Sequence, residues 1–546
     1  MIDPLITRLI REWDYMEAVQ APHRPIWQEL SDFILPRRAD IVTKRSPASK
    51  ISTRLYDSTA PHANELLAST FSGTLTPDSD RWFSLRMRNE ELNEDVEVSE
   101  WLHTCATRMF SALNQSNFSA ETHENYLDMG CFGITGLVCL EKSIITPFFN
   151  GLNFKAHQVG EFVIAEDEQG RVNQFGRNLN YTVTQAAQAF GSKYVDDDTI
   201  KSKLQNNPHD KTNIKHLVMP KQPEQTDIFS AQFDFSSYYI DYDRKKVIST
   251  GGFHEFPGMF PRWTKVANDI YGYSQGYIAL PDIRSLNKSR ELSLRALAKH
   301  IDPPLLVRDD GVIGQVNTGA SMPTVVRGDP NTAVIPLQSG GKYDIVQVEE
   351  QMLVQSILKI FYADLVAFLD KKYMTAMEVE KQLEMMYRRL GPVIGRLVNE
   401  YLAPIINRVF MIMLRRGAFP PIPESLILAH QNGEGDIDVV YEGPLAKAQR
   451  GGSLAAIEKA YALWANIAPV QPEIMDVPNA TKIGRFIGQA AGLPNQLMND
   501  KAEIEKRRAG RLADAQAQAE QQDQEVSGEV MKDVAQANAA TEGAGA

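Results

Sequence analysis

Apolar residues at the start of the chain recur every three or four positions, which is the spacing of one face of an α-helix. Prolines at 22 and 25 interrupt the first run, whose apolar members are Leu5, Leu9, Trp13 and Met16. The same spacing resumes at 26–35 and returns at 54–75 and 98–113. We therefore expect the N-terminal part to be helical, with a proline break near residue 22.

Residues 130–265 have a different pattern. β-Branched and aromatic residues gather around Val138, at 162–164 and at 233–240, with glycines between them. Such runs are typical of strands joined by turns. With the helical patterns elsewhere, they predict an α+β fold that is mostly helical.

Two long helical patterns, at 281–302 and 348–369, bracket a segment at 303–347 that is rich in Gly, Pro, Val and Ile. We expect the bracketed segment to form short strands joined by turns. The apolar stripe of the first helix consists of Ile283, Leu286, Leu294, Leu297 and Ile301. Another face carries Arg284, Lys288, Arg295 and Lys299, diluted by Glu291. That face is compatible with either a solvated surface or a DNA contact.

A third long pattern begins at Thr375, which has the capping-box spacing with Glu378. Its apolar positions recur at helical spacing to about residue 416, too far for a helix that packs within one small domain. Candidate kinks lie at Gly391-Pro392, Gly395 and Pro404. We expect this helix to cross the body of the protein.

Length and charge limit the function classes. The 546 residues predict three or four structural units, and the tail from residue 501 has too few large apolar residues for a core of its own. The formal net charge of −12 gives a surface that repels phosphate on average. We therefore do not expect a sequence-specific DNA binder, and any DNA contact should be local or sliding.

The sequence predicts synthesis in the cytosol and no membrane partner. Its first residues lack the basic flank and apolar run of a signal peptide, and no apolar stretch is expected to reach the ~20 residues that span a bilayer. The three cysteines, Cys105, Cys131 and Cys139, form no CxxC pair. An odd number of unpaired cysteines favours reduced thiols.

A search for catalytic motifs predicts no catalytic residues, no metal site and no cofactor. No phosphate-binding loop exists, because Gly341-Lys342 is followed by Tyr343, so a packaging ATPase is not expected. The ten histidines include no HExxH motif, and Asp196-Asp197-Asp198 lacks the spacing of a calcium loop. Three glycines at a spacing of three predict close packing or turns: Gly130, Gly133 and Gly136.

One formal match to a catalytic pattern exists. Residues 272–276 spell G-x-S-x-G, the turn that presents a nucleophilic serine in hydrolases, and would make Ser274 the nucleophile. The preceding segment, 264–270, is too polar for the buried strand that this turn requires. A plain glycine turn is the preferred interpretation, and a hydrolase remains an alternative because catalytic groups need only meet in space.

Four sequence blocks resemble the head-to-tail connector, or portal, proteins of podoviruses. In order along the chain they are LYDSTAPHANELLASTFSGTLTPDSDRWFSL (55–85), YGYSQGYIALPDIRSLN (271–287), MTAMEV (374–379) and YEGPLAKAQR (441–450). The family often has Gly-Pro shortly after the Tyr-Gly pair, where this chain has Ser274-Gln275. That departure also creates the G-x-S-x-G match, which favours an accidental origin for it.

The resemblance implies a subunit with wing, stem, clip and crown. The wing would cover 1–280, the stem helices 281–302 and 348–369, the clip 303–347, the channel loop 370–374 and the long wing helix 375–416. The crown would cover 417–500, and 501–546 would form a C-terminal barrel or a disordered tail.

The resemblance also implies a mechanical function without catalysis. A ring of twelve subunits would occupy one capsid vertex of the virion and serve as the channel for double-stranded DNA during packaging and ejection. Expected partners are further copies of the chain, the terminase large subunit, tail adaptor proteins, scaffolding protein and the major capsid protein. The hypothetical DNA contacts are Lys288, Arg295, Lys299, Lys371 and Lys372. A tail adaptor is the second alternative, although it should lack the two stem helices around an insert and the long wing helix.

Overall fold

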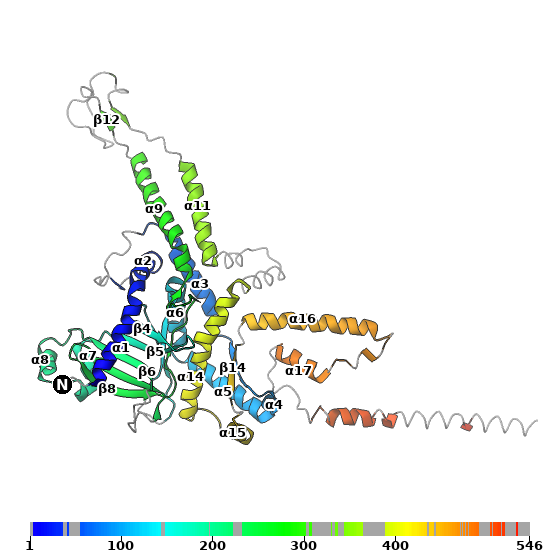
Figure 1. Ribbon diagram of the computed structural model, residues 1–546. Coiled ribbons are helices and arrows are strands. Elements are labelled where there is room, and N and C mark those ends of the chain that lie inside the picture. Colours follow the sequence, from blue (N-terminus) through cyan, green and yellow to red (C-terminus); the bar gives the residue numbers. More distant parts are fainter. Residues whose placement is uncertain are drawn as a thin grey trace, which may run out of the picture. The chain divides into compact units, whose positions relative to one another are not determined.

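The computed structural model describes most of the chain. The described residues are 4–36, 41–42, 55–142, 148–195, 197–221, 232–301, 305–307, 329, 334–336, 343–363, 388–433, 436–441, 444–469, 471, 473–474, 477–478, 480–490, 503–504, 506–514, 516–518 and 531–532. They form an α+β fold that is mostly helical, with antiparallel sheets (Figure 1). The predicted fold class is confirmed at this level.

The chain divides into two compact units. The first unit contains Met1–Ser84, Cys105–Pro420 and Val439–Leu445. The second contains Leu85–Thr104, Pro421–Asp438 and Ala446–Ala546. The chain crosses between the units within strands β1 (Phe83–Met87) and β14 (Ile437–Tyr441) and within helices α5 (Val96–Asn114) and α16 (Pro444–Ile467).

The N-terminal helices of the first unit break where the prolines predict. Helix α1 (Pro4–Gln20) is followed by the 3-10 turn Ala21–His23 and by α2 (Arg24–Ile34). Helix α1 packs on the five-stranded sheet through the stripe that its periodicity indicates. The buried members are Ile6, Leu9, Trp13 and Met16, against Val163, Leu217, Met219, Tyr238 and Ile240.

The five-stranded sheet is an antiparallel meander in the order β4-β5-β6-β7-β8. Its strands are β4 (Phe162–Glu166), β5 (Val172–Leu179), β6 (Ile214–Pro220), β7 (Phe235–Asp241) and β8 (Lys246–Phe253). The connection from β5 to β6 carries two helices that the sequence pattern did not predict, α7 (Val183–Phe190) and α8 (Asp198–Asn206). Both begin at residues whose side chains cap the helix, Thr182 and Asp197. These capping residues were the available helix signal, but they lie in a region dominated by strand-forming residues.

A buried cluster of one arginine and two histidines lies on the sheet face opposite α1. Arg177 donates through Nε to His216 Nδ1 at 2.9 Å and lies 3.0 Å from His157 Nε2. His216 is fully buried, stacks on Tyr239 and contacts Ser237 Oγ at 2.9 Å. Burial, reinforced by the charge of Arg177, holds the pKa of His216 well below its usual 6.5.

A smaller sheet and two helices form the rest of the body. The sheet order is β3-β2-β9, from β3 (Leu152–His157), β2 (Gly136–Glu141) and β9 (Gly258–Met259). Helices α3 (Thr59–Leu75) and α6 (Phe118–Phe132) pack closely at Gly130. They leave no room for a side chain there, since a Cβ at Gly130 would lie 2.2 Å from Asn64 Oδ1. Gly133 ends α6 with φ +80°, so the packing and turn roles predicted for these glycines are confirmed.

Two antiparallel helices bracket a β-pair, as the pattern predicts. Helix α9 (Gln275–Ile301) runs beside α11 (Tyr343–Ile360), and β12 (Leu305–Val307) pairs with β13 (Val334–Pro336) at the end of the two helices (Figure 1). Helix α9 begins before the predicted residue 281, because Pro281 is tolerated inside it. Helix α11 ends before the predicted residue 369, at a turn where Tyr362 has φ +59°.

The long helix is described from residue 388. It passes through a π-helical turn at Val398–Leu402 and continues as α14 (Ala403–Arg415). The predicted irregularity near Pro404 is confirmed, and Gly417, with φ +63°, follows the end of α14. The predicted capped start at Thr375 and the segment 370–374 lie outside the described residues.

Among the residues that the structure describes, one helix is long and apolar enough by length and composition to cross a bilayer: Arg388–Arg415. The expectation that no apolar stretch reaches the length needed to span a bilayer is wrong for this helix, judged by length and composition. In its apolar stretch, 56% of the residues are buried in the protein. Its Arg408 is buried and paired with Glu255 at 2.6 Å, as expected of a core helix.

The second unit is mainly helical in its described part. It contains α4 (Glu90–Glu94), α15 (Glu424–Gln431), most of α16 and α17 (Ala480–Ala490). Arg88 pairs with Asp438 at 2.9 Å and with Asp436. Between residues 445 and 495, the described residues are mostly helical.

The His216 cluster predicts acid sensitivity of the large sheet. Because the folded pKa of His216 lies below the unfolded value of about 6.5, its stabilising contribution is complete above pH 6.5 and declines as the pH falls below it. His157 shifts in the same direction through burial. Thermal unfolding followed by circular dichroism at several pH values should show this loss, and His216→Gln should make the decline shallower. An unchanged slope in the variant would contradict the assignment.

Candidate functional site

The two stem-like helices meet along a polar seam near their middle. Glu350 of α11 is buried and accepts hydrogen bonds from Ser289 Oγ at 3.0 Å and Ser293 Oγ at 2.9 Å. Arg290 lies 3.2 Å from the same carboxylate. Nearer the base, Ser356 donates to Asp282 at 2.7 Å. These contacts fix the register of α9 against α11.

The start of α9 is also attached to the body. The backbone N–H of Tyr56 donates to Asn287 Oδ1 at 2.7 Å, and Arg290 lies 3.7 Å from Asp57. Arg284 pairs with Glu29 of α2. One of the four residues predicted on the basic face is therefore engaged in holding the helix.

The predicted DNA contacts on α9 are exposed but partly neutralised. Lys288 Nζ lies 2.9 Å from Glu291 Oε2, and Arg295 pairs with the same carboxylate. The hydrogen bond from Lys288, with the attraction of Arg295, holds the pKa of Glu291 below its usual value. Lys299 is exposed in the last turn of α9. Lys371 and Lys372 lie outside the described residues.

The apolar stripe of α9 divides into two halves. Ile283 and Leu286 at the base are buried, whereas the distal members are 50–75% exposed: Leu294, Leu297 and Ile301. On α11, Val348 is 52% and Met352 is 68% exposed. Both helices of the hairpin therefore leave large apolar side chains exposed, and we call this set the distal stem surface: Leu294, Leu297, Ile301, Val348 and Met352.

Ser274 lies at a strand-to-helix junction, so the expected plain glycine turn is not what residues 272–276 form. Strand β11 (Gly272–Tyr273) leads directly into α9. Ser274 is 2% exposed, and its Oγ donates to the carbonyl of Cys131 at 2.6 Å. A hydroxyl buried and committed in this way is unsuited to act as a nucleophile. The glycines serve packing, because a Cβ at Gly272 would lie 2.2 Å from Gly133 O.

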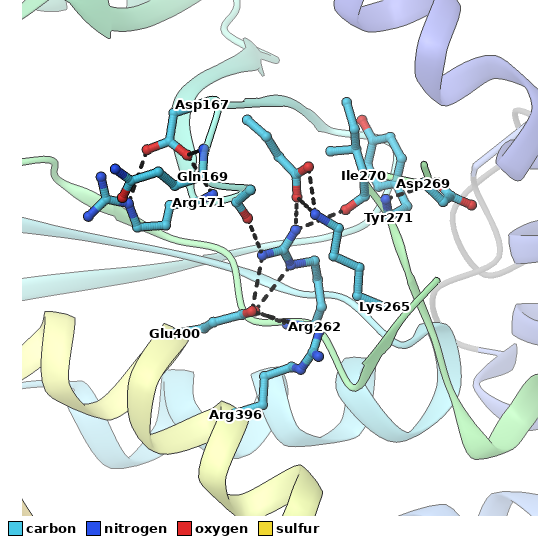
Figure 2. A network of polar contacts seen from close by, with 12 residues as sticks. Asp167, Gln169, Arg171, Arg262, Lys265, Asp269, Ile270, Tyr271, Arg396 and Glu400 are labelled. Atoms are coloured by element: carbon cyan, nitrogen blue, oxygen red, sulfur yellow. Dashed lines mark hydrogen bonds and ion pairs between the residues drawn. The ribbon is translucent and has the colours of Figure 1, made fainter. Parts of the chain in front are cut away.

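A buried arginine lies beside this junction. Arg262, between β9 and β10 (Thr264–Lys265), is 3% exposed. Its Nη2 lies 3.0 Å and its Nε 3.1 Å from the two carboxylate oxygens of Glu400, and its backbone N–H donates to the same carboxylate at 3.0 Å. Figure 2 shows the guanidinium surrounded by these and further acceptors. Such two-oxygen pairing is among the stronger charge-assisted arrangements.

The remaining acceptors of Arg262 come from two other segments. Nη1 pairs with Glu166 at the end of β4, and Nη2 donates to Gly170 O at 3.1 Å. Nη1 also donates to Ile270 O at 3.4 Å, just before β11. Lys265 Nζ completes the charge balance at 2.6 Å from Glu166. The carboxylates of Glu166 and Glu400 thus face the cations of Arg262 and Lys265. A third cation, Arg396, lies 3.9 Å from Glu400.

The other polar candidates have structural partners. His123 contacts Ser72 Oγ at 3.1 Å and Glu65 at 3.4 Å. Asp197 caps α8. Within the described residues, no group of three or more His, Cys, Asp or Glu is placed to hold a metal ion. All three cysteines are buried, and burial raises the pKa of Cys139 to about 12, which keeps its thiol protonated.

Sequence inspection missed the residues that carry the buried ion pairs. Arg262 and Glu400 lie far apart in sequence, and neither belongs to a motif. Glu350 follows Glu349 near the start of the helix predicted from residue 348, where acidic residues are common. The only available signal for Glu400 was a charged residue within an apolar helical pattern, beside Tyr401.

Comparison with known proteins identifies the family. A family model described as bacteriophage head to tail connecting protein matches residues 7–498. The chain belongs to this family. The connector is 27% identical over 530 residues to a probable portal protein of Bordetella phage BPP-1, covering 93% of this chain and 92% of the relative. It is 24% identical over 527 residues to the portal protein of Salmonella phage epsilon15, with the same coverage of 93% and 92%.

Solved structures from gene transfer agent particles are also similar. The neck of an empty particle has a TM-score of 0.39 at 11% identity, covering 85% of the connector and 99% of the other chain. A chain of the native virion has a TM-score of 0.32 at 11% identity, with the same coverage of 85% and 99%.

The expected membership of the head-to-tail connector family is therefore confirmed, and the relatives that match over most of their length are named as portal proteins of bacteriophages.

The Gly272 contact predicts a sharp difference between two glycine substitutions. Gly272→Ala should destabilise the connector by about 1–3 kcal/mol or more, because the clashing atom is a backbone oxygen that cannot move aside. Gly73→Ala, in the interior of α3 with nothing within 4 Å of its Cβ, should stabilise it by about 1 kcal/mol. Urea unfolding of both variants measures the difference. Equal stability of Gly272→Ala and wild type would contradict the packing role.

Proposed function

We propose that the connector forms a ring of twelve subunits whose central channel carries double-stranded DNA into the capsid and out of it. The observation that carries the proposal is the distal stem surface. Large apolar side chains that are left exposed on one element often mark a contact with another protein. Fully burying each such side chain is worth about 1.5–3 kcal/mol, so a neighbouring copy that covers the surface would gain several kcal/mol per contact.

A second copy is the occupant that the geometry favours. The surface repeats on every subunit and lies beside the polar seam, which already uses the facing sides of α9 and α11. Packing hairpins side by side around an axis would bury each distal stem surface while leaving the basic face of α9 exposed. Closed rings are the arrangement in which such a head-to-tail contact satisfies every copy.

The parts of the chain then take the roles that the family resemblance implies. The helices around 281–302 and 348–369 would be the stem, 303–347 the clip, 370–374 the channel loop and 375–416 the long wing helix. Residues 1–280 would form the wing, 417–500 the crown and 501–546 the C-terminal barrel or tail. The antiparallel helix pair with a β-pair at its end supports this division.

The partners follow from these roles. The clip would bind the terminase large subunit during packaging and tail adaptor proteins afterwards. The wing and crown would contact the major capsid protein and scaffolding protein during head assembly. None of these steps requires catalysis by this chain, and we propose that it has none.

The proposed DNA contacts are Lys288, Arg295 and Lys299, together with Lys371 and Lys372. Glu291 holds Lys288 and Arg295 close to the helix and cancels part of their charge. A weakly basic stripe in an acidic protein suits a channel through which DNA slides, because stronger phosphate pairing would slow its passage.

The two alternatives are less well supported. A tail adaptor should lack the helix pair around a β-insert, which this chain has. A hydrolase built on Ser274 would need that hydroxyl to be accessible, but it is buried and bonded to Cys131 O.

Ring formation should depend on the distal stem surface. In wild type, electron microscopy and light scattering should show rings with a central hole. The double variant Leu297→Ser/Met352→Ser should shift the protein towards smaller species with unchanged circular dichroism. Tyr15→Ser, which removes an equally exposed aromatic residue from α1, serves as the control and should leave rings intact. Rings of unchanged yield in the double variant would exclude this surface as the contact.

DNA binding should respond in opposite directions to two changes on α9. The variant Lys288→Gln/Arg295→Gln/Lys299→Gln should weaken binding of a short duplex and lower the slope of log K against log salt, by up to about 0.9 for each phosphate that is no longer neutralised. Glu291→Gln should strengthen binding, because it releases two cations. Fluorescence anisotropy across a salt series measures both.

The matched control for DNA binding removes three exposed lysines from the wing, as Lys155→Gln/Lys193→Gln/Lys203→Gln. It makes the same change in net charge at another place. If it weakens binding as much as the α9 variant does, the binding is non-specific and the proposed contacts on α9 are wrong.

A further inference from the structure

The π-helical turn of the long helix is held on two sides by neighbouring residues. Glu400 binds Arg262, as Figure 2 shows. Tyr401, the next residue, accepts a hydrogen bond from Asn125 Nδ2 of α6 at 2.8 Å, and Asn125 Oδ1 accepts one from Thr135 at 2.6 Å. The turn is therefore fixed both to the core helix α6 and to the segment that leads into α9.

Pro404 explains why the helix widens at this point. A proline has no N–H, and its ring would clash with the carbonyl four residues earlier, which is that of Glu400. The helix instead adopts π geometry, and the N–H of Ala403 donates to Val398 O, five residues back. This turn lacks the regular α-helical hydrogen bonds, so it is a point at which the long helix can yield.

Arg262 connects that point to the base of the stem. Its guanidinium binds Glu400 and also the carbonyl of Ile270, two residues before β11. Strand β11 pairs with β10, the strand that follows Arg262. Only Ser274 separates the end of β11 from the start of α9. A displacement of Glu400 would therefore break charged hydrogen bonds in a buried place unless Arg262 and the start of α9 moved with it.

We propose that Arg262 and Glu400 form a joint that couples the long helix to the base of α9. Arg262 is a positioning residue in this role, because it acts through the segments that it binds. Through this joint, a movement of the long helix at residues 398–402 is transmitted to the start of α9. The inference concerns contacts within one subunit and stands independently of ring size and of the DNA contacts on α9.

Hydrogen–deuterium exchange of the full-length protein tests the joint. In Glu400→Gln, peptides covering 264–280 should exchange on the order of tenfold faster than in wild type, together with peptides covering 396–404. A salt bridge that acts only locally would change 396–404 alone, and that result would overturn the proposal. Arg262→Lys keeps the charge but loses the planar fork, so it should give the same paired increase.

The matched control lies further along the same helix. Glu255, which follows β8, accepts hydrogen bonds from Arg408 at 2.6 Å and from Arg415 at 3.0 Å, and neither of these partners belongs to α9. Glu255→Gln should raise exchange at 253–258 and 405–416 and leave 264–280 unchanged. An equal effect at 264–280 would show that general loosening, not the joint, is being measured.

A conservative variant keeps the test decisive if Glu400→Gln does not fold. Glu400→Asp retains the charge and shortens the reach to Arg262. It should raise exchange at 264–280 and 396–404 together, by a smaller factor. A rise at 396–404 with none at 264–280 would again overturn the joint.

Discussion

The guanidinium of Arg262 is buried where three segments meet, and its charge cannot remain there without partners. Removing an ion from water costs several kcal/mol, which is offset only when carboxylates and carbonyls surround it with good geometry. Glu400, Glu166 and two backbone carbonyls supply that geometry. The end of β4, the long helix and the approach to α9 must all be in place at once. This electrostatic requirement, together with the contacts of Arg284, Asn287 and Arg290, holds the start of α9 on the body.

The helix pair α9 and α11, in contrast, does not satisfy all of its side chains within the subunit. Its base buries Ile283 and Leu286 within the subunit, but its distal half has no further chain to cover it among the described residues. A two-helix hairpin has too few neighbours to bury apolar residues on both flanks, so the hydrophobic free energy of the distal stem surface is left for contact with other molecules. Membership of a head-to-tail connecting family is consistent with that division between a self-sufficient body and an incomplete stem.

The spacing of apolar residues and the positions of prolines in the sequence predicted several helices and their breaks. The proline break after α1, the helix pair around a β-insert and the irregularity near Pro404 all have local signals. Helices α7 and α8 were missed because strand residues surround them. The apolar stripe of α9 was recognised as a stripe, but periodicity cannot say that its upper half is left exposed by the rest of the chain.

The ion pairs could not be predicted in the same way. Arg262 and Glu400 are 138 positions apart, and their pairing depends on how the sheet and the long helix pack. The basic face of α9 was found from its spacing, yet its charge could only be weighed once Glu291 was placed between Lys288 and Arg295. Family and role came from the resemblance of four blocks, because residue patterns alone left a solvated surface and a DNA contact equally open.

The polar seam of the stem has a consequence for its dimensions. Interdigitated leucines can slip by one helical turn and still find apolar neighbours, but Glu350 would lose hydrogen-bond donors. Because Ser289 and Ser293 are themselves one turn apart, a shift of about 5.4 Å would leave its carboxylate beside at most one of them. Ser289, Ser293 and Arg290 together therefore favour the observed register. The seam thereby favours one relative height of α9 and α11 in every copy, which is what the proposed ring would need of subunits that stand level around a common axis.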